Sequence, residues 1–317
     1  MNRDAIVGGV LWCSLLVTAE AGGLALEWID LLFLFAPLVV VPLGLELTRR
    51  VEQAGLPPRP ERIARLVQLP CALAATISFC VSPGFVSAGL ALVWLLFCAT
   101  LALGGVIRLR CGACRKVDSA LPGAAFLYLP VGAAWLCASR LGLKPLGFEE
   151  PVVLLTAVHF HYAGFAAPLL ARSSIRALGP WRAPSLSAAL VRALAGGVAL
   201  GPALLAAGFL LGPRVNLVAA VILVASEIGL ALSFLVAIRH VSQPQARCLV
   251  GVAAAAAVFA MVLAALWAVG EYPLEPFLQL AEMARFHGTA NAFGFTLCGL
   301  VGWSLAVPVE ADRRGCR

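Results

Sequence analysis

The feature that most constrains this chain is a succession of long apolar segments with little charge inside them. A helix needs about 20 apolar residues to cross the hydrocarbon core of a membrane. Measured against that length, the sequence predicts ten spanning helices, at roughly 5–23, 28–47, 66–86, 88–107, 120–138, 151–171, 186–212, 216–238, 248–269 and 279–307. The segments are continuous and lack the alternation of a β-barrel wall. We therefore expect an all-α, polytopic transmembrane helix bundle.

Composition narrows the class of protein further. Hydrophobic residues make up 62% of the chain and charged residues only 12%, whereas a soluble domain carries about 25% charged residues. A soluble enzyme, a disordered chain and a secreted disulfide scaffold are therefore excluded. The apolar segments cover most of the 317 residues, so we expect a single transmembrane helical domain over 1–317.

The distribution of basic residues predicts the orientation. Lysine and arginine are retained in cytoplasmic loops during insertion. They concentrate in alternate predicted loops, whereas the opposite loops contain only Arg140, Lys144 and Arg214. Both termini are therefore predicted to be cytoplasmic. The net charge of +7 then reflects topology and contact with membrane lipid, and no basic face typical of nucleic-acid binding is visible.

Two segments allow more than one interpretation. Residues 1–21 end on an Ala19-Glu20-Ala21 sequence that could be a signal-peptide cleavage site. We favour retention, because proteins with many spans rarely need a separate cleaved signal. Cys111 and Cys114 form a CxxC pair in a basic loop, but a structural zinc site needs four ligands. We favour free thiols there.

A small set of polar residues inside the predicted spans supplies the candidate site, because ionisable groups in a membrane are costly and usually functional. The set is His159, His161, Glu227, His287 and Asn291. The three histidines and Glu227 lie about 8–11 residues past the outer start of their spans, so a rise of 1.5 Å per residue places them at one depth. Residues two apart in a regular helix point about 200° apart, so His159 and His161 face one metal only if the helix is distorted. The alternative is that such side chains hydrogen-bond neighbouring helices.

Two blocks of sequence around these histidines resemble a known family. They are His159-Phe-His161-Tyr-Ala-Gly-Phe165 and Phe286-His287-Gly-Thr-Ala-Asn291-Ala-Phe-Gly-Phe295. Both resemble the YndJ-like family of bacterial membrane proteins, and the later segment Gly299-Leu-Val-Gly-Trp303 fits as well. The resemblance implies a location in the bacterial cytoplasmic membrane and a helical architecture, but it implies no reaction.

The leading functional hypothesis is a membrane-embedded enzyme acting on a lipophilic small-molecule substrate. In one version, His159, His161, His287 and Glu227 bind a divalent metal, with Asn291 supporting them. In the other, histidine and Glu227 perform acid–base chemistry without a metal. Bound haem is a further alternative, because histidine is a common axial ligand.

Two rival classes of function remain open. One is a transporter of a small solute or lipid, since transporters also place ionisable residues at mid-membrane. The other is a non-catalytic membrane accessory protein, in which the polar cluster only joins helices. The sequence contains no nucleotide-binding P-loop or dinucleotide fingerprint, and it leaves the oligomeric state open.

Overall fold

The computed structural model describes residues 2–52, 57–110, 117–178, 185–271 and 278–306. Within these ranges the chain forms helices and no strand, which confirms the predicted all-helical fold. Seven long helices are uninterrupted: α1 (Arg3–Glu20), α4 (Arg59–Ile77), α5 (Phe85–Arg110), α6 (Val117–Leu141), α9 (Ser185–Leu211), α10 (Pro213–Ala237) and α11 (Pro244–Glu271). The CxxC pair at Cys111 and Cys114 lies outside the described residues.

Three further long helices each contain a π-helical segment. The first is α2 (Trp28–Phe35), η1 (Ala36–Val40) and α3 (Val41–Glu52); the second is α7 (Val152–His159), η4 (Phe160–Ala166) and α8 (Ala167–Leu178); the third is α12 (Leu280–Thr289), η6 (Ala290–Leu297) and α13 (Cys298–Ala306). Two short 3₁₀ turns, η3 (Pro145–Gly147) and η5 (Ile238–His240), lie between longer helices. Since π-segments are rare and are frequently found at functional sites, we searched for a candidate site along these three helices.

Seven of the described helices are long and apolar enough to cross a membrane. They are Trp28–Arg50, Phe85–Arg110, Val117–Leu141, Val152–Leu178, Ala189–Leu211, Pro213–His240 and Pro244–Gly270. The remaining predicted spans correspond to α1, to α4 and to the helix that begins with α12. That last helix carries Glu282, Arg285 and His287 in its first turns, which lowers its hydropathy. The structure thus contains seven helices that are long and apolar enough to cross a membrane, called clear spans below, and the full count of ten spans stays a prediction.

The boundaries of α4 differ from those predicted. The sequence predicted a span over 66–86, whereas α4 starts at Arg59 and ends at Ile77. Proline is favoured in the first turn of a helix, where its missing N–H has no partner to lose, and Pro60 occupies that position. At the other end, Gly84 adopts a φ of 155° in the connection to α5, a conformation that only glycine reaches easily. The error arose because apolar residues continue through this turn.

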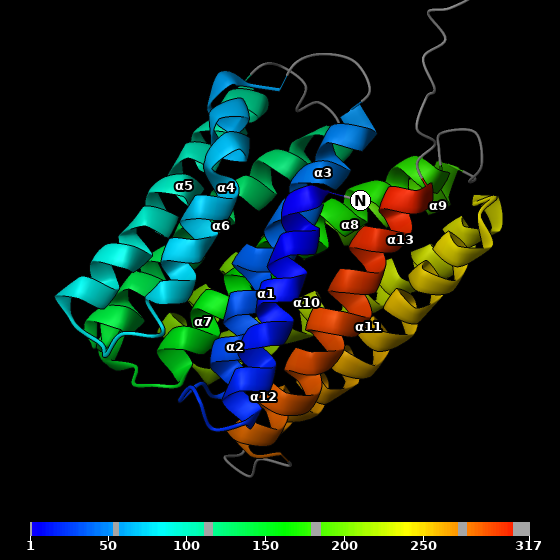
Figure 1. Cartoon of the computed structure of the whole chain (residues 1–317). Helices are drawn as coiled ribbons and strands as arrows, with labels where there is room; N and C mark the ends of the chain where they lie inside the picture. Colours follow the sequence, from blue (N-terminus) through cyan, green and yellow to red (C-terminus); the bar gives the residue numbers. More distant parts are fainter. Residues whose placement is uncertain (1, 53–56, 111–116, 179–184, 272–277, 307–317) are drawn as a thin grey trace, which may run out of the picture.

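The three π-containing helices form the core of the bundle. α2 contacts α7 and α12, η4 contacts both η1 and η6, and α3, α8 and α13 all contact one another. In Figure 1 these helices run side by side from the labels α2, α7 and α12 to the labels α3, α8 and α13. Two of these central helices are clear spans, Trp28–Arg50 and Val152–Leu178. Of the residues in their most apolar 18-residue stretch, 83% and 72% are buried, whereas the share is 50% or less in every other clear span. They therefore occupy the centre.

The other helices surround this core in two groups. α4, α5 and α6 pack together on one side, and α9, α10 and α11 pack together on the other. α1 packs on η1 and α2, and Gly8 makes this contact possible, because a Cβ atom there would lie 1.8 Å from the carbonyl oxygen of Leu38.

Side chains from other helices satisfy the backbone around η1. Pro37 has no N–H, and a π-segment shifts the bonding pattern by one residue, so carbonyl groups near it lose regular helical partners. The Trp12 indole donates to the Leu31 carbonyl at 2.7 Å, and the Tyr162 hydroxyl donates to the Leu32 carbonyl at 2.8 Å. The Gln68 amide donates to the Pro37 carbonyl at 2.7 Å. In lipid each unsatisfied carbonyl would be costly, so these bonds hold α1 and η4 against α2, and α4 against η1.

Candidate functional site

The same position in each π-segment carries a distinctive residue. The second residue is Pro37 in η1, His161 in η4 and Asn291 in η6. The Nδ1 atom of His161 bonds the carbonyl of Ala157, and the side-chain amide of Asn291 bonds the carbonyl of His287, four residues back in both cases. A π-helical N–H bonds the carbonyl five residues back instead of four. The carbonyl four residues back therefore loses its backbone donor, and the side chain of His161 or Asn291 supplies one in its place. His161 and Asn291 therefore stabilise the distorted turns in which they lie.

His161 is fully enclosed and uses both ring nitrogens. Its Nδ1 donates to the Ala157 carbonyl at 2.8 Å, and its Nε2 accepts from the Trp94 indole at 3.1 Å. The imidazole lies against Gly132 of α6, where a Cβ atom would be 2.7 Å from Nδ1. The ring of Phe33 meets it edge-on at 5.2 Å. Neither nitrogen is left to bind a metal or exchange a proton in this arrangement.

His287 is also held at both nitrogens. Its Nδ1 lies 2.9 Å from the carbonyl oxygen of Ala260 on α11, and its Nε2 lies 3.1 Å from the side-chain nitrogen of Asn291. Because a carbonyl only accepts and an amide nitrogen only donates, the proton must reside on Nδ1. Gly288 beside it brings the helix close to Leu32 of α2, since a Cβ there would lie 2.7 Å from the leucine side chain. The imidazole is thus oriented rigidly at the edge of the core.

His159 differs from the other two intramembrane histidines. Its Nε2 atom is buried and has no hydrogen-bond partner. It lies within range of an electrostatic interaction with His287, which agrees with the contact between η4 and η6. The sequence analysis required a distorted helix if His159 and His161 were to face one metal. Such a distortion is present, because the helix becomes π-helical at Phe160. Even so, the two histidines of this motif are in different situations: His161 is bonded to Trp94 of α5, whereas His159 Nε2 has no partner.

Glu227 is the second buried titratable group without a full set of partners. Its side chain is 4% exposed, and its Oε2 atom has no hydrogen-bond partner. Glu227 lies two helical turns before Phe234, on the same face of α10. Phe234 stacks on Phe295 with ring centroids 6.2 Å apart, and His287 lies about two turns before Phe295. This geometry gives Glu227 and His287 a similar depth.

The predicted four-ligand metal site is not assembled in this structure. Among the residues that the structure describes, no group of three or more His, Cys, Asp or Glu side chains could hold a metal ion. The set predicted from the sequence was His159, His161, His287 and Glu227. His161 is turned to Trp94 and Ala157, so the set is divided between two sides of the helix. His159, His287 and Glu227 remain as the candidate site, with Asn291 orienting His287.

The sequence analysis missed one polar cluster of the described residues. Glu61 is fully buried, and it accepts hydrogen bonds from Arg65 at 2.5 Å and from Arg108 of α5 at 2.5 Å. The prediction placed Glu61 and Arg65 in a loop. The signal that could have identified them is their spacing of four residues, which allows a helical ion pair.

Fold and site together define the class of protein. It is a helical, multi-pass membrane protein in which two of the central helices carry a polar residue, His161 or Asn291, at the same position of a π-segment. The comparison with family models identifies the group. A model described as "YndJ-like protein" matches residues 31–295. The chain belongs to the YndJ-like family, which confirms the resemblance seen in the two histidine blocks.

One curated relative supports this assignment. The chain is 27% identical over 226 residues to a Bacillus subtilis protein named "Uncharacterized membrane protein YndJ". The alignment covers 71% of this chain and 40% of that relative, so the chain spans less than half the length of the relative it matches. No solved structure matches the chain.

Proposed function

We propose that this chain is a ten-span protein of the bacterial cytoplasmic membrane that performs acid–base chemistry on a lipophilic substrate. Both termini would lie in the cytoplasm, and the site would lie in the outer half of the membrane. His159 and Glu227 would exchange protons with the substrate, and His287 would be held beside His159 by Ala260 and Asn291.

One observation carries this proposal. Among the described residues, His159 Nε2 and Glu227 Oε2 are the only imidazole and carboxylate atoms that are buried without a partner. An unsatisfied polar group in an apolar interior is costly, so a native structure retains one where a ligand, a proton or a water uses it. Such an arrangement suits proton transfer, because general acids and bases need a free atom within reach of the substrate.

The acid–base version is favoured over the metal-assisted version by the hydrogen bonds of the histidines. His161 and His287 use both ring nitrogens within the protein. A metal would need to break at least one of these bonds. The partner left behind would then be a buried or part-buried polar group without a hydrogen bond, which is costly. Haem ligation by either ring meets the same obstacle.

The ten-span topology has structural support beyond the seven apolar helices. α1 and the helix that begins with α12 each pack along the central helix that begins with α2, which is a clear span. α4 packs along α5, another clear span. Arg3 in the first turn of α1, and Arg59 and Arg62 in the first turn of α4, lie at the helix ends that would remain in the cytoplasm.

The test is to purify the protein in mild detergent and identify what it retains, by mass spectrometry for lipids and by elemental analysis for metals. His159→Leu and Glu227→Gln are the test variants, and His240→Ala is the control, because His240 is exposed in η5. We expect a lipophilic molecule that the control retains and both test variants lose. A stoichiometric metal lost with His159 would support the metal-assisted version instead. Retention that is identical in all variants would overturn the site and favour an accessory role.

Transport is distinguished from an enzyme by a second experiment on the same preparations. A transporter in sealed vesicles would move a solute or lipid across the membrane without changing it. An enzyme would convert the retained molecule into a product. The retained molecule supplies the candidate substrate for both assays.

A further inference from the structure

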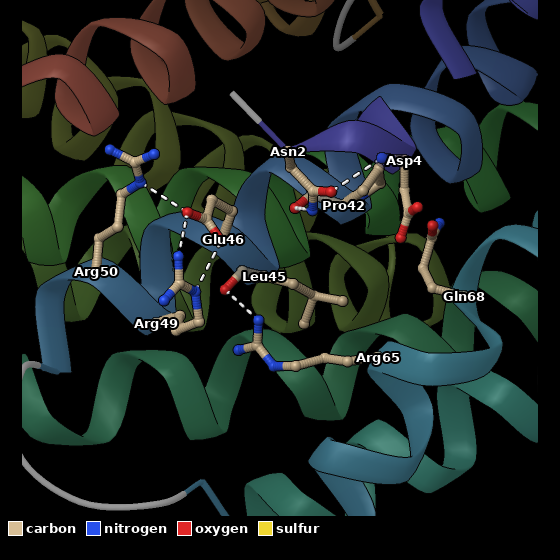
Figure 2. A pocket seen from close by; sticks show the side chains of 9 residues that line it. All are labelled: Asn2, Asp4, Pro42, Leu45, Glu46, Arg49, Arg50, Arg65 and Gln68. Atoms are coloured by element: carbon tan, nitrogen blue, oxygen red, sulfur yellow. Dashed lines mark hydrogen bonds and ion pairs between the residues drawn. The ribbon is translucent and has the colours of Figure 1, made fainter. Parts of the chain in front are cut away.

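A pocket lies at the end of the bundle opposite the histidines, between the start of α1, the end of α3 and the first turns of α4. Its volume is about 390 Å³. The residues that line it are Asn2, Asp4, Pro42, Leu45, Glu46, Arg49, Arg50, Arg65 and Gln68. Figure 2 shows Arg49 and Arg50 on one side of the pocket and Asp4 and Gln68 on the other.

The arginines of the pocket carry an excess of positive charge. Three guanidinium groups line it, against the two carboxylates of Asp4 and Glu46. Glu46 is shared, because it accepts from Arg49 and from Arg50 at 2.7 Å each. One carboxylate cannot neutralise both cations, so this trio keeps a net positive charge. Guanidinium groups in such a cluster suit a phosphate, which they bind through charge-assisted hydrogen bonds.

The far side of the pocket offers acceptors in place of donors. Gln68 is 2% exposed, and its Oε1 atom is buried without a partner, because its Nε2 is committed to the Pro37 carbonyl. The Asp4 carboxylate forms no ion pair with any described residue. A buried, unpaired amide oxygen next to a carboxylate needs a donor such as a hydroxyl or ammonium group.

The backbone and the neighbouring helices hold this arrangement in place. Arg65 donates to the Leu45 carbonyl at 2.7 Å and to Glu61 at 2.5 Å. Arg50 donates to the Ser304 carbonyl of α13 at 3.2 Å. The Nε atom of Arg65 is buried and has no partner, so a donor as well as an acceptor is left unused. These fixed contacts make the pocket a preformed site with both kinds of group.

From this pattern we infer that the pocket binds the glycerophosphodiester headgroup of an anionic phospholipid. The phosphate would contact Arg49 and Arg50, and the hydroxyl groups beyond it would donate to Gln68 Oε1 and Asp4. One phosphodiester charge balances the excess positive charge of Arg49 and Arg50, which share Glu46, since Arg65 is already paired with Glu61. Placement in the inner leaflet rests on the topology proposed above, whereas the pocket itself does not depend on the histidine site.

The test measures binding of short-chain phosphatidylglycerol to the purified full chain by equilibrium dialysis. Arg49→Gln is the test variant, because its side chain is 62% exposed and its loss is compatible with folding. Arg239→Gln is the matched control, since Arg239 is an exposed arginine of η5 outside the pocket. We expect affinity about tenfold weaker in Arg49→Gln, the equivalent of one charge-assisted hydrogen bond, and unchanged in Arg239→Gln.

Three further probes separate the possible sources of the phosphate and the role of the acceptors. Phosphatidylcholine of the same chain length lacks a headgroup donor and is expected to bind more weakly. Glycerol 3-phosphate tests for a soluble ligand, and it is expected to compete only poorly without acyl chains. Equal weakening in the two variants, equal binding of the two lipids, or full competition by glycerol 3-phosphate would each overturn the assignment. His159→Leu should leave this binding intact, so failure here and failure of the proposed acid–base site are separate results.

Discussion

The hydroxyl group of Tyr162 donates a 2.8 Å hydrogen bond to the carbonyl oxygen of Leu32, which lies 130 positions earlier in the chain. It joins two of the three central helices at the level of their π-segments. Removing the hydroxyl in Tyr162→Phe should leave that carbonyl unsatisfied inside the bundle. We expect a loss of about 1–2 kcal/mol in stability, measured as a lower thermal midpoint in detergent.

Tyr128→Phe is the control for this substitution. Tyr128 also donates to a backbone carbonyl, that of Ala199, at 2.7 Å. Ala199 lies within α9, which contains no π-segment, and a carbonyl of a regular α-helix also accepts from the N–H four residues later. A decrease as large as that of Tyr162→Phe would contradict the role assigned to the π-segment.

Gly8 and Gly9 provide a matched pair for the packing of α1. A methyl group at Gly8 would lie 1.8 Å from the Leu38 carbonyl oxygen, whereas at Gly9 it would meet nothing within 4 Å. Gly8→Ala should therefore displace α1 from η1 and cost about 1–3 kcal/mol or more. Gly9→Ala should be neutral or slightly stabilising, because alanine has the better helix propensity. Equal thermal midpoints for the two variants would show that α1 does not pack there.

Replacement by leucine should change the stability of the protein much more at His161 than at His159. His161→Leu leaves the Trp94 indole and the Ala157 carbonyl without their partner, so we expect a loss of about 2–3 kcal/mol. His159→Leu removes a buried nitrogen that has no partner and should change stability by less than about 1 kcal/mol. Unfolding in detergent compares them. A larger destabilisation from His159→Leu would mean that its ring has a structural partner.

The buried carboxylate of Glu61 should be essential for the α4–α5 contact. It accepts from Arg65 and from Arg108, and Glu61→Gln would remove the buried negative charge that both guanidinium groups contact. Breaking a buried ion pair in this way costs about 3–5 kcal/mol. The exposed pair of Lys144 and Glu149 is the control, and Glu149→Gln should cost less than about 1 kcal/mol. Similar losses in the two variants, measured by thermal unfolding, would contradict the burial of Glu61.

Much of the fold is predictable from the sequence, because span length and apolar continuity act locally. The helix observed at Leu280–Ala306 agrees closely with the predicted span at 279–307, and α9 and α10 agree in the same way. The failure at α4 has a physical cause. Hydropathy does not register the prolines at its start or the turn at Gly84.

The candidate site is less accessible to sequence reasoning. Depth along a helix follows from residue number, so a similar depth for His159 and His287 could be predicted from the sequence. The direction of a side chain depends on the helical period, and nothing in the sequence announced a π-segment beginning at Phe160. The partner of His161, the Trp94 indole, comes from a helix 67 positions away, and such tertiary contacts have no local signal.

The central claim is that His159 is the available imidazole, whereas His161 and His287 are held by the protein. It can be tested by ¹⁵N NMR of histidine-labelled protein, because the chain has only four histidines, and single substitutions assign each resonance. His161 and His287 should show the tautomer with the proton on Nδ1, and their resonances should not change when membrane lipid extract is added. The His159 resonances should shift on that addition. An unchanged His159 spectrum, or a proton on Nε2 of His161 or His287, would contradict the account.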